Sequence, residues 1–205
     1  TVGSFKKEIK PLDIVIIDQF VDRTNQARKM TFFGDGVVVH IAFAEPICST
    51  LSDILYEVAK KLTVRNNITV HKGGTYINME GPAFSTEAES FLYKSWGMDV
   101  IGMTNMPEAK LAREAEICFS TVAMVTDYDA WYEEESVVTV DMIIQNLNKN
   151  VKVVKDLIRN VIPLIPKERN CICASALKNA IITRIDLISG KRKKELNPII
   201  GKYIK

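Results

Sequence analysis

The feature that most constrains this chain is an apolar run that ends at a pair of acids. Residues 117–125 are rich in β-branched and small side chains, which predicts a buried strand of a largely parallel sheet. Asp127 and Asp129 follow the run, and a helix-period pattern begins soon after them. Because ligands of open α/β sheets lie outside the carboxyl ends of strands, the acids are placed to meet a group with N–H donors and a basic nitrogen. A solvated turn is the alternative, since Asp and Tyr are common after strands.

The rest of the hydrophobic pattern predicts an α/β domain around this strand. Short apolar runs bounded by turn-forming residues predict further strands over residues 14–20, 37–43, 68–70, 75–79 and 99–103. Apolar positions at helical spacing, with capping residues before them, predict helices over residues 51–62, 86–96, 140–161 and 170–188, and another that opens at residues 104–108. Strand, helix and strand leading to Asp127 form a βαβ unit.

The composition bounds the class of protein. A chain of 205 residues with 47% hydrophobic and 25% charged residues is long enough for one sizeable core. The formal net charge is only +2 and no basic face alternates with aromatic residues, which argues against a nucleic-acid partner. The sequence has neither an apolar run of membrane-spanning length nor the pattern of a signal peptide. We therefore expect no membrane partner and a cytoplasmic location.

Three further residues are candidates for the site of the paired acids. Phe84 lies between a predicted strand and a predicted helix at the same sheet edge, where it could stack on a flat ligand, although core packing is the commoner fate of Phe. Thr104 opens a helix whose free N–H groups suit an anion such as phosphate. His40 lies within an apolar run, where a lone His is more often a core residue than a site residue.

Five motifs are spread along residues 18–129. They are Asp18-Gln19-Phe20-x-Asp22-Arg23-Thr24, His40-x-x-x-Ala44-Glu45-Pro46, Glu80-Gly81-Pro82-x-Phe84-Ser85, Met103-Thr104-x-x-Pro107-Glu108 and Thr126-Asp127-Tyr128-Asp129. Each motif is weak alone, and the order and spacing of all of them are specific. Taken together, they resemble the methylthioadenosine phosphorylases, in the trimeric branch of the purine nucleoside phosphorylases. The match is dense over residues 1–163 and thinner beyond.

The resemblance implies both a fold and a reaction. The fold is a single-domain twisted mixed β-sheet flanked by helices, with a helical C-terminal part. The reaction is the reversible phosphorolysis of 5′-methylthioadenosine to adenine and 5-methylthioribose 1-phosphate, with inorganic phosphate as co-substrate and no cofactor. The assembly is a homotrimer or a dimer of trimers. A 6-oxopurine nucleoside phosphorylase, a nucleosidase that uses water and a non-catalytic nucleoside-binding relative are the alternatives.

The resemblance also assigns roles to residues. Asp127 matches the acid that faces N7 of the purine, and Asp129 matches the partner of the adenine amino group. Phe84 matches the residue that stacks on the base, and Met103 the residue under the ribose. The remaining roles are phosphate binding by Thr1, Val2 and Thr104, contact with the 5′-methylthio group by His40 (from a neighbouring subunit), Val140 and Ile144, and selection of a 6-aminopurine by Ser85 together with Asp127.

One part of the family's pattern does not occur in the sequence. The first portion of the family's domain, with its Gly/Thr-rich phosphate loop and early strands, has no counterpart here. We therefore expect residues 1–205 to be the C-terminal portion of one nucleoside phosphorylase domain. The alternative is a phosphate site that is built differently.

The four cysteines give a second prediction. Cys48 and Cys118 match cysteines that are paired in archaeal thermophilic members of the family, and Cys171-x-Cys173 resembles the Cys-x-Cys of those members. The resemblance thus implies a thermophilic protein with disulfides, and four buried free thiols are the alternative. We expect no metal site, because the sequence offers no evident pair of partners to complete a zinc site.

Overall fold

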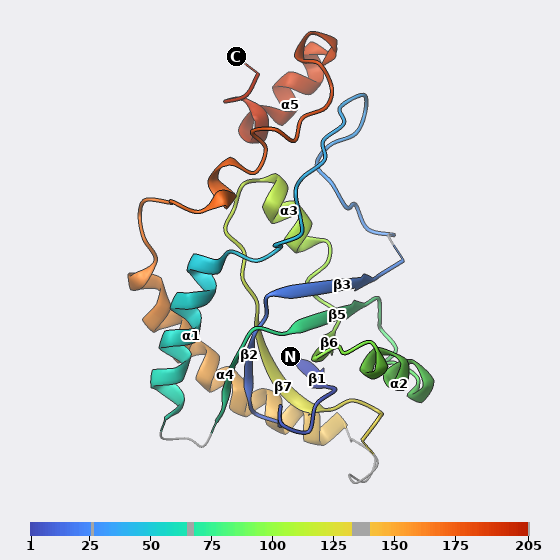
Figure 1. Ribbon diagram of the computed structural model, residues 1–205, viewed down its shortest axis with the longest axis vertical. Helices are drawn as coiled ribbons and strands as arrows, with labels where there is room; N and C mark the ends of the chain where they lie inside the picture. The colour runs from blue at the N-terminus through green and yellow to red at the C-terminus, as the bar shows by residue number, and fades with distance from the viewer. Residues whose placement is uncertain (26, 65–67, 133–139, 205) are drawn as a thin grey trace.

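The computed structural model describes residues 1–25, 27–64, 68–132 and 140–204. Its centre is a seven-stranded sheet with the strand order β3-β5-β6-β1-β7-β2-β4 (Figure 1). The strands are β1 (Val2–Ser4), β2 (Ile14–Ile16), β3 (Gln19–Arg23), β4 (Val70–Lys72), β5 (Thr75–Met79), β6 (Val100–Gly102) and β7 (Val122–Tyr128). The helices are α1 (Ser49–Thr63), α2 (Glu87–Ser95), α3 (Glu108–Glu114), α4 (Val140–Val161) and α5 (Gly190–Ile200), with 3-10 turns η1 (Ile162–Leu164), η2 (Ile172–Ser175) and η3 (Ile185–Leu187).

The sheet is mixed, as the family resemblance implied. The pairs β1–β7, β2–β4, β3–β5 and β5–β6 are parallel, and the pairs β1–β6 and β2–β7 are antiparallel. The short strand β1 lies between β6 and β7, so Gly3 is flanked by Ile101 of β6 and by Asp127 of β7. This arrangement positions the candidate site.

Both faces of strand β2 are buried, which explains why its sequence is an unbroken apolar run. Ile14 and Ile16 pack with residues of α1 and α4, which lie side by side on one face of the sheet (Figure 1). Val15 and Ile17 point the other way and pack with Val125 of β7. Full burial of such a side chain stabilises the fold by about 1.5–3 kcal/mol. The helices predicted over residues 51–62 and 140–161 are confirmed as α1 and α4.

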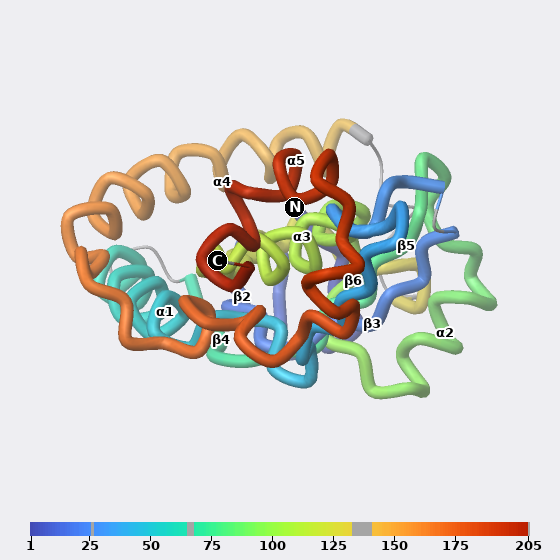
Figure 2. The backbone as a smooth tube through the Cα atoms, turned by 90° about the horizontal axis from the view of Figure 1, so that it is seen from above, coloured from blue at the N-terminus to red at the C-terminus, as the bar shows by residue number. Residues whose placement is uncertain are grey.

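Two predicted elements are wrong. Residues 37–43 form no strand of the sheet and take part only in the bridges Gly34–Val37 and Val39–Ile181. Residues 170–188 form no α-helix and contain only the turns η2 and η3. The reason is the same in both cases, because the apolar side chains of the two segments pack against each other and against α5. Figure 2 shows this C-terminal segment from above, in front of α3.

The boundaries of the strand that carries the paired acids also differ from the prediction. Strand β7 begins at Val122 rather than at Ile117, which is 57% exposed. It continues through Asp127 because that residue pairs with Gly3 of β1. Among the described residues, no helix combines the length and the apolar character needed to cross a membrane.

Candidate active site

A cavity of about 230 Å³ lies where β1 runs between β6 and β7. Strands β1, β5, β6 and β7, helix α4 and the segments that follow β5 and β6 all contribute to its lining. The structure thus brings together residues that are far apart in the sequence. Those among them that the sequence predicted are Thr1, Val2, Phe84, Met103, Thr104, Asp127 and Asp129.

Gly3 of β1 lies beside both acids. A Cβ atom there would meet Cγ2 of Ile101 at 3.2 Å, which is a tight contact, and would lie at ordinary contact distance from Oδ2 of Asp127 (3.4 Å) and Cβ of Asp129 (3.5 Å). The backbone of β1 therefore passes close to both acids. The hydroxyl of Thr126 donates a hydrogen bond to Oδ1 of Asp127 at 2.5 Å, which fixes one oxygen of that carboxylate.

Asp129 is held at the turn that follows β7. Its backbone N–H donates to the carbonyl of Ser4 at 3.0 Å, and Nε1–H of Trp131 donates to the same carbonyl at 2.7 Å. The hydroxyl of Ser85 lies 3.0 and 3.2 Å from the two carboxylate oxygens of Asp129 and donates to them. Burial raises the pKa of the Asp129 carboxyl above its ordinary value, against the opposing effect of the hydrogen bonds from Ser85. This carboxyl is therefore easier to protonate than an exposed Asp.

The wall formed by Met103 and Thr104 rests on β5. Tyr76 of β5 is buried, and its phenol oxygen accepts a hydrogen bond from the N–H of Thr104 at 3.3 Å. A Cβ atom on Gly102 would lie 2.0 Å from this phenol oxygen, so only glycine allows the strand to approach so closely. A Cβ atom on Gly81 would likewise lie 2.5 Å from the sulfur of Met103.

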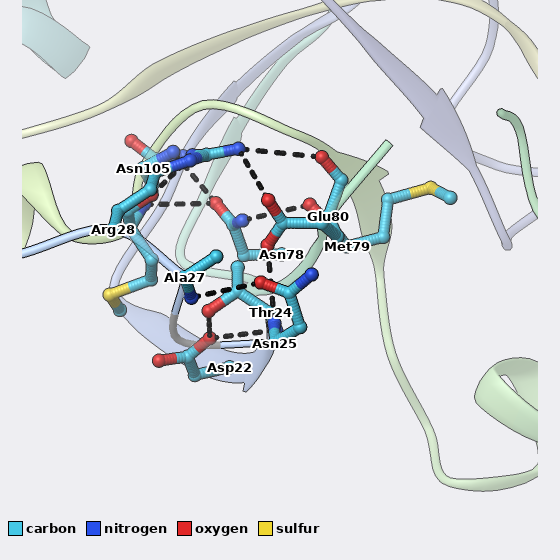
Figure 3. A network of polar contacts seen from close by, with 10 residues as sticks. Asp22, Thr24, Asn25, Ala27, Arg28, Asn78, Met79, Glu80 and Asn105 are labelled. Atoms are coloured by element: carbon cyan, nitrogen blue, oxygen red, sulfur yellow. Dashed lines mark hydrogen bonds and ion pairs between the residues drawn. The ribbon is translucent and has the colours of Figure 1, made fainter. Parts of the chain in front are cut away.

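A polar network holds the backbone just after Thr104 (Figure 3). The side chain of Asn78 is fully buried, and its carbonyl oxygen accepts from the N–H groups of Asn105 and Met106 at 2.7 and 3.1 Å. The guanidinium of Arg28 donates to the carbonyl of Met106 at 3.0 Å and to the carboxylate of Glu80 at 3.1 Å. The loop that follows β3 is thereby attached to the chain just beyond Thr104.

Several predicted residues lie outside the cavity. Ser85 reaches it only through Asp129. His40 is exposed and lines a separate cavity. Ile144 is 46% exposed, and its neighbour Ile143 lines the cavity instead. Val140 begins α4, and its side chain is outside the described part of the structure.

Sequence reasoning missed six contributors to the cavity. They are Gly3, Met79, Ile101, Gly102, Thr126 and Ile143. Each lies within or next to a motif or element that the sequence indicated. Its closeness along the chain to a predicted site residue or element was therefore the only signal that the sequence offered. The pattern of apolar residues cannot distinguish Ile143 from Ile144, because both lie on the apolar side of the same helix.

Comparison of the sequence with known families shows to which family the chain belongs. Residues 1–163 match the sequence profile of the phosphorylase superfamily. The chain belongs to that superfamily. The matched residues include every element that lines the cavity.

Relatives within the superfamily share most of the chain. An S-methyl-5′-thioadenosine phosphorylase from Geobacter sulfurreducens is 57% identical over 203 residues, which cover 99% of this chain and 70% of that protein. The enzyme of the same name from Koribacter versatilis is 52% identical over 98% of this chain and 68% of its own length. Both organisms are bacteria, so the comparisons do not support the expectation of an archaeal thermophilic member.

Solved structures agree with the sequence comparison. A methylthioadenosine phosphorylase from an Antarctic soil metagenomic library superposes with a TM-score of 0.89 at 44% identity, covering 97% of this chain and 69% of that chain. A Schistosoma mansoni methylthioadenosine phosphorylase in complex with adenine superposes with a TM-score of 0.81 at 31% identity, covering 91% of this chain and 71% of that chain. The predicted fold class is therefore confirmed.

The cysteines do not form the expected bridges. All four are free in the structure, so neither a Cys48–Cys118 nor a Cys171–Cys173 disulfide is present. The four sulfur atoms nevertheless all lie within 4.8 Å of one another. We expected no metal site because the sequence showed no evident pair of partners to complete one, and the fold brings all four cysteines together.

Proposed function

We propose that this chain carries out the phosphorolysis of 5′-methylthioadenosine, releasing adenine and forming 5-methylthioribose 1-phosphate. One observation supports this above all: Asp127 and Asp129 lie together in a cavity that also contains Phe84, Met103 and Thr104. A purine has a flat face, a basic N7 and, in adenine, an amino group that donates hydrogen bonds. The relatives named above are 52–57% identical and carry the name of this activity.

The chemical step is the exchange of one bond at C1′ of the ribose for another. The C1′–N9 bond breaks while an oxygen of inorganic phosphate bonds to C1′, and the electron pair leaves with the purine. Adenine departs as an anion unless N7 accepts a proton, which a positioned carboxyl can supply. General acid catalysis of this kind contributes about 10²–10⁴ in rate. Asp127 is our candidate for the group that faces N7.

The second acid sets the protonation state and the choice of base. Two neighbouring carboxyls disfavour a double negative charge, and burial raises the pKa of Asp129. The pair can therefore hold one proton and still accept a hydrogen bond from the amino group at C6. Ser85 orients Asp129 by donating to both of its oxygens. A 6-oxopurine presents an acceptor at this point, and a mismatch between buried polar groups can cost 10⁴–10⁵ in discrimination.

Phosphate and the methylthio group complete the proposed assignment. Thr104, Thr1 and Val2 line the cavity and are our candidates for contact with phosphate, which serves as co-substrate without a cofactor. Ile143 lines the same cavity and joins Val140 and Ile144 as a candidate for contact with the methylthio group. His40 is exposed and lies on another cavity, so we propose that it reaches the site of a neighbouring subunit in a homotrimer.

A phosphate-dependence assay tests the proposed function. Adenine release from methylthioadenosine should require inorganic phosphate and yield methylthioribose 1-phosphate, and inosine should react far more slowly. Release that is unchanged in phosphate-free buffer would instead identify a nucleosidase. Binding of methylthioadenosine without turnover would identify a non-catalytic relative. Faster turnover of inosine would identify a 6-oxopurine enzyme.

A further inference from the structure

Four cysteines from three segments of the chain meet at one point of the fold. Cys48 precedes α1, Cys118 lies between α3 and β7, and Cys171 and Cys173 belong to the segment around η2. Their four Sγ atoms all lie within 4.8 Å of one another, and those of Cys118 and Cys171 are 3.4 Å apart. We propose that this cluster is a structural zinc site with four thiolate ligands.

The mutual spacing of the sulfurs carries the proposal. Zinc binds thiolates at about 2.3 Å in a tetrahedron, so the sulfur–sulfur edges of such a site are about 3.8 Å long. A pair of disulfides requires each sulfur to approach only one partner, to about 2.05 Å. In this fold every sulfur lies within 4.8 Å of the other three. Four ligands around one centre have this arrangement. Small rotations of the cysteine side chains would bring the sulfur–sulfur distances to the value of about 3.8 Å that zinc requires.

The surroundings suit a closed site for a soft metal. The side chains of Cys48 and Cys173 are buried, and those of Cys118 and Cys171 are half-buried. A cavity of about 310 Å³ touches Cys48, Cys118 and Cys171 and provides a path for the ion to enter. Thiolates select zinc over hard cations such as magnesium and calcium.

Positive groups balance the charge of the proposed site. Zinc with four thiolates carries a net charge of −2, which is costly to bury without compensation. Cys48 lies at the N-terminus of α1, where the positive end of the helix dipole offsets part of this negative charge. Lys167 and Arg169 line the cavity that touches Cys48, Cys118 and Cys171.

The proposed ion would connect three parts of the molecule. It would join the start of α1, the segment that enters β7 and the C-terminal segment that packs on the loop over residues 31–41. Because an unfolded chain holds no such site, zinc bound there stabilises the folded state. None of the four cysteines lines the cavity of Asp127, so the ion would not touch the reacting atoms.

Metal and thiol content of the wild-type chain test the proposal directly. The full chain, purified without added metal or chelator, should contain about one zinc per chain by mass spectrometry of the element. Denaturation with a chelator and no reductant should expose all four thiols to a thiol reagent. Absence of thiols would overturn the proposal in favour of two disulfides. Four thiols with no zinc bound, even after reduced protein is titrated with Zn²⁺, would overturn it in favour of packed free thiols.

A ligand variant and a matched control sharpen the test. Cys173→Ser should lower the zinc content at least tenfold and abolish the fall in melting temperature that a chelator causes in the wild type. Ser175→Ala, an exposed change in the same turn, should leave both properties unchanged. Full zinc retention by Cys173→Ser would contradict the assignment. If that variant fails to fold, Co²⁺ alone, added to the metal-free wild type, still tests the assignment. Co²⁺ in a tetrahedral thiolate site gives intense visible absorption, whereas disulfides or free thiols that bind no metal give none.

Discussion

At the scale of single residues, the candidate site depends on what small residues allow as much as on the acids themselves. Gly3 packs closely against Ile101 beside Asp127 and Asp129, and Gly102 allows the phenol of Tyr76 to approach the wall that holds Thr104. The acids were visible in the sequence because two carboxyls after an apolar run form a local pattern. The glycines were not, because the contact that excludes a side chain comes from another strand.

Replacing Asp127 tests the role proposed for it. Asp127→Asn keeps the size of the side chain and its hydrogen bond from Thr126 but cannot supply a proton to N7. We expect turnover of methylthioadenosine to fall by about 10² or more, with an unchanged melting temperature. Asp156→Asn, on the exposed side of α4, is the control and should leave turnover unchanged. Wild-type turnover in Asp127→Asn would contradict the assignment.

The carboxyl of Asp129 predicts a pH dependence of stability with a definite sign. Burial raises its pKa in the folded protein, so the folded state binds this proton more tightly than the unfolded chain does. The resulting stabilisation is fully present below the ordinary Asp pKa of about 3.9 and is lost as the pH rises through the raised folded-state pKa. Asp129→Asn removes this loss, so we expect the variant to gain stability relative to wild type as the pH rises from below 3.9 to neutrality.

Urea denaturation at a series of pH values measures this effect. The difference in unfolding free energy between Asp129→Asn and wild type should grow with pH and then level off. The exposed variant Asp156→Asn should show no such growth. Parallel curves for wild type and Asp129→Asn would show that the pKa of this carboxyl is not raised.

At the scale of elements, sequence patterns predicted what local chemistry determines. Thr86 caps α2 and exchanges hydrogen bonds with Glu89, and the helix predicted over residues 86–96 is confirmed as α2. The apolar stripe of α1 packs on β2, as its periodicity required. Residues 37–43 and 170–188 were assigned wrongly because their apolar side chains are buried by each other, and a periodicity does not identify the segment that will cover it.

The support beneath the Met103–Thr104 wall gives a prediction at this scale. Asn78→Ala would leave the buried N–H groups of Asn105 and Met106 without their acceptor. Each unsatisfied group costs about 1–3 kcal/mol of unfolding free energy, and the wall beside Thr104 loses its anchor. We expect lower stability together with a higher KM for phosphate.

A helix-cap variant separates the two effects. Thr86→Ala removes the cap of α2 and should cost about 0.5–2 kcal/mol without raising the KM for phosphate. Both variants are thus destabilised, and only Asn78→Ala should change phosphate saturation. An unchanged KM for phosphate in Asn78→Ala would show that the network supports the fold but not the site.

At the scale of the whole molecule, the order of the strands was beyond the reach of sequence patterns. Strand β1 inserts between β6 and β7, although the three strands are far apart in the sequence. The convergence of the four cysteines has the same origin, because it follows from tertiary packing of three separate segments. The family resemblance supplied the architecture that propensity and periodicity could not.

The proposed sharing of sites between subunits gives the last prediction. If His40 contacts the methylthio group across an interface, His40→Ala should raise the KM for methylthioadenosine without lowering turnover at saturation. Asp127→Asn should be almost inactive at any substrate concentration. In a cyclic trimer that mixes the two variants, an intact site forms wherever the Asp127 of one subunit meets the His40 of the next. Random mixing of equal amounts therefore restores about a quarter of the sites.

Subunit exchange between the two variants measures this recovery. Activity at a methylthioadenosine concentration well below the KM of His40→Ala should rise after the proteins are unfolded together and refolded, compared with the same proteins mixed without exchange. Asp127→Asn alone, unfolded and refolded at the same total protein concentration, provides the baseline. Recovery requires that each site draw residues from two chains, because a site within one chain always contains one of the two substitutions. Activity that equals the sum of the separate variants, in a mixture proven to exchange subunits, would therefore place His40 outside the site.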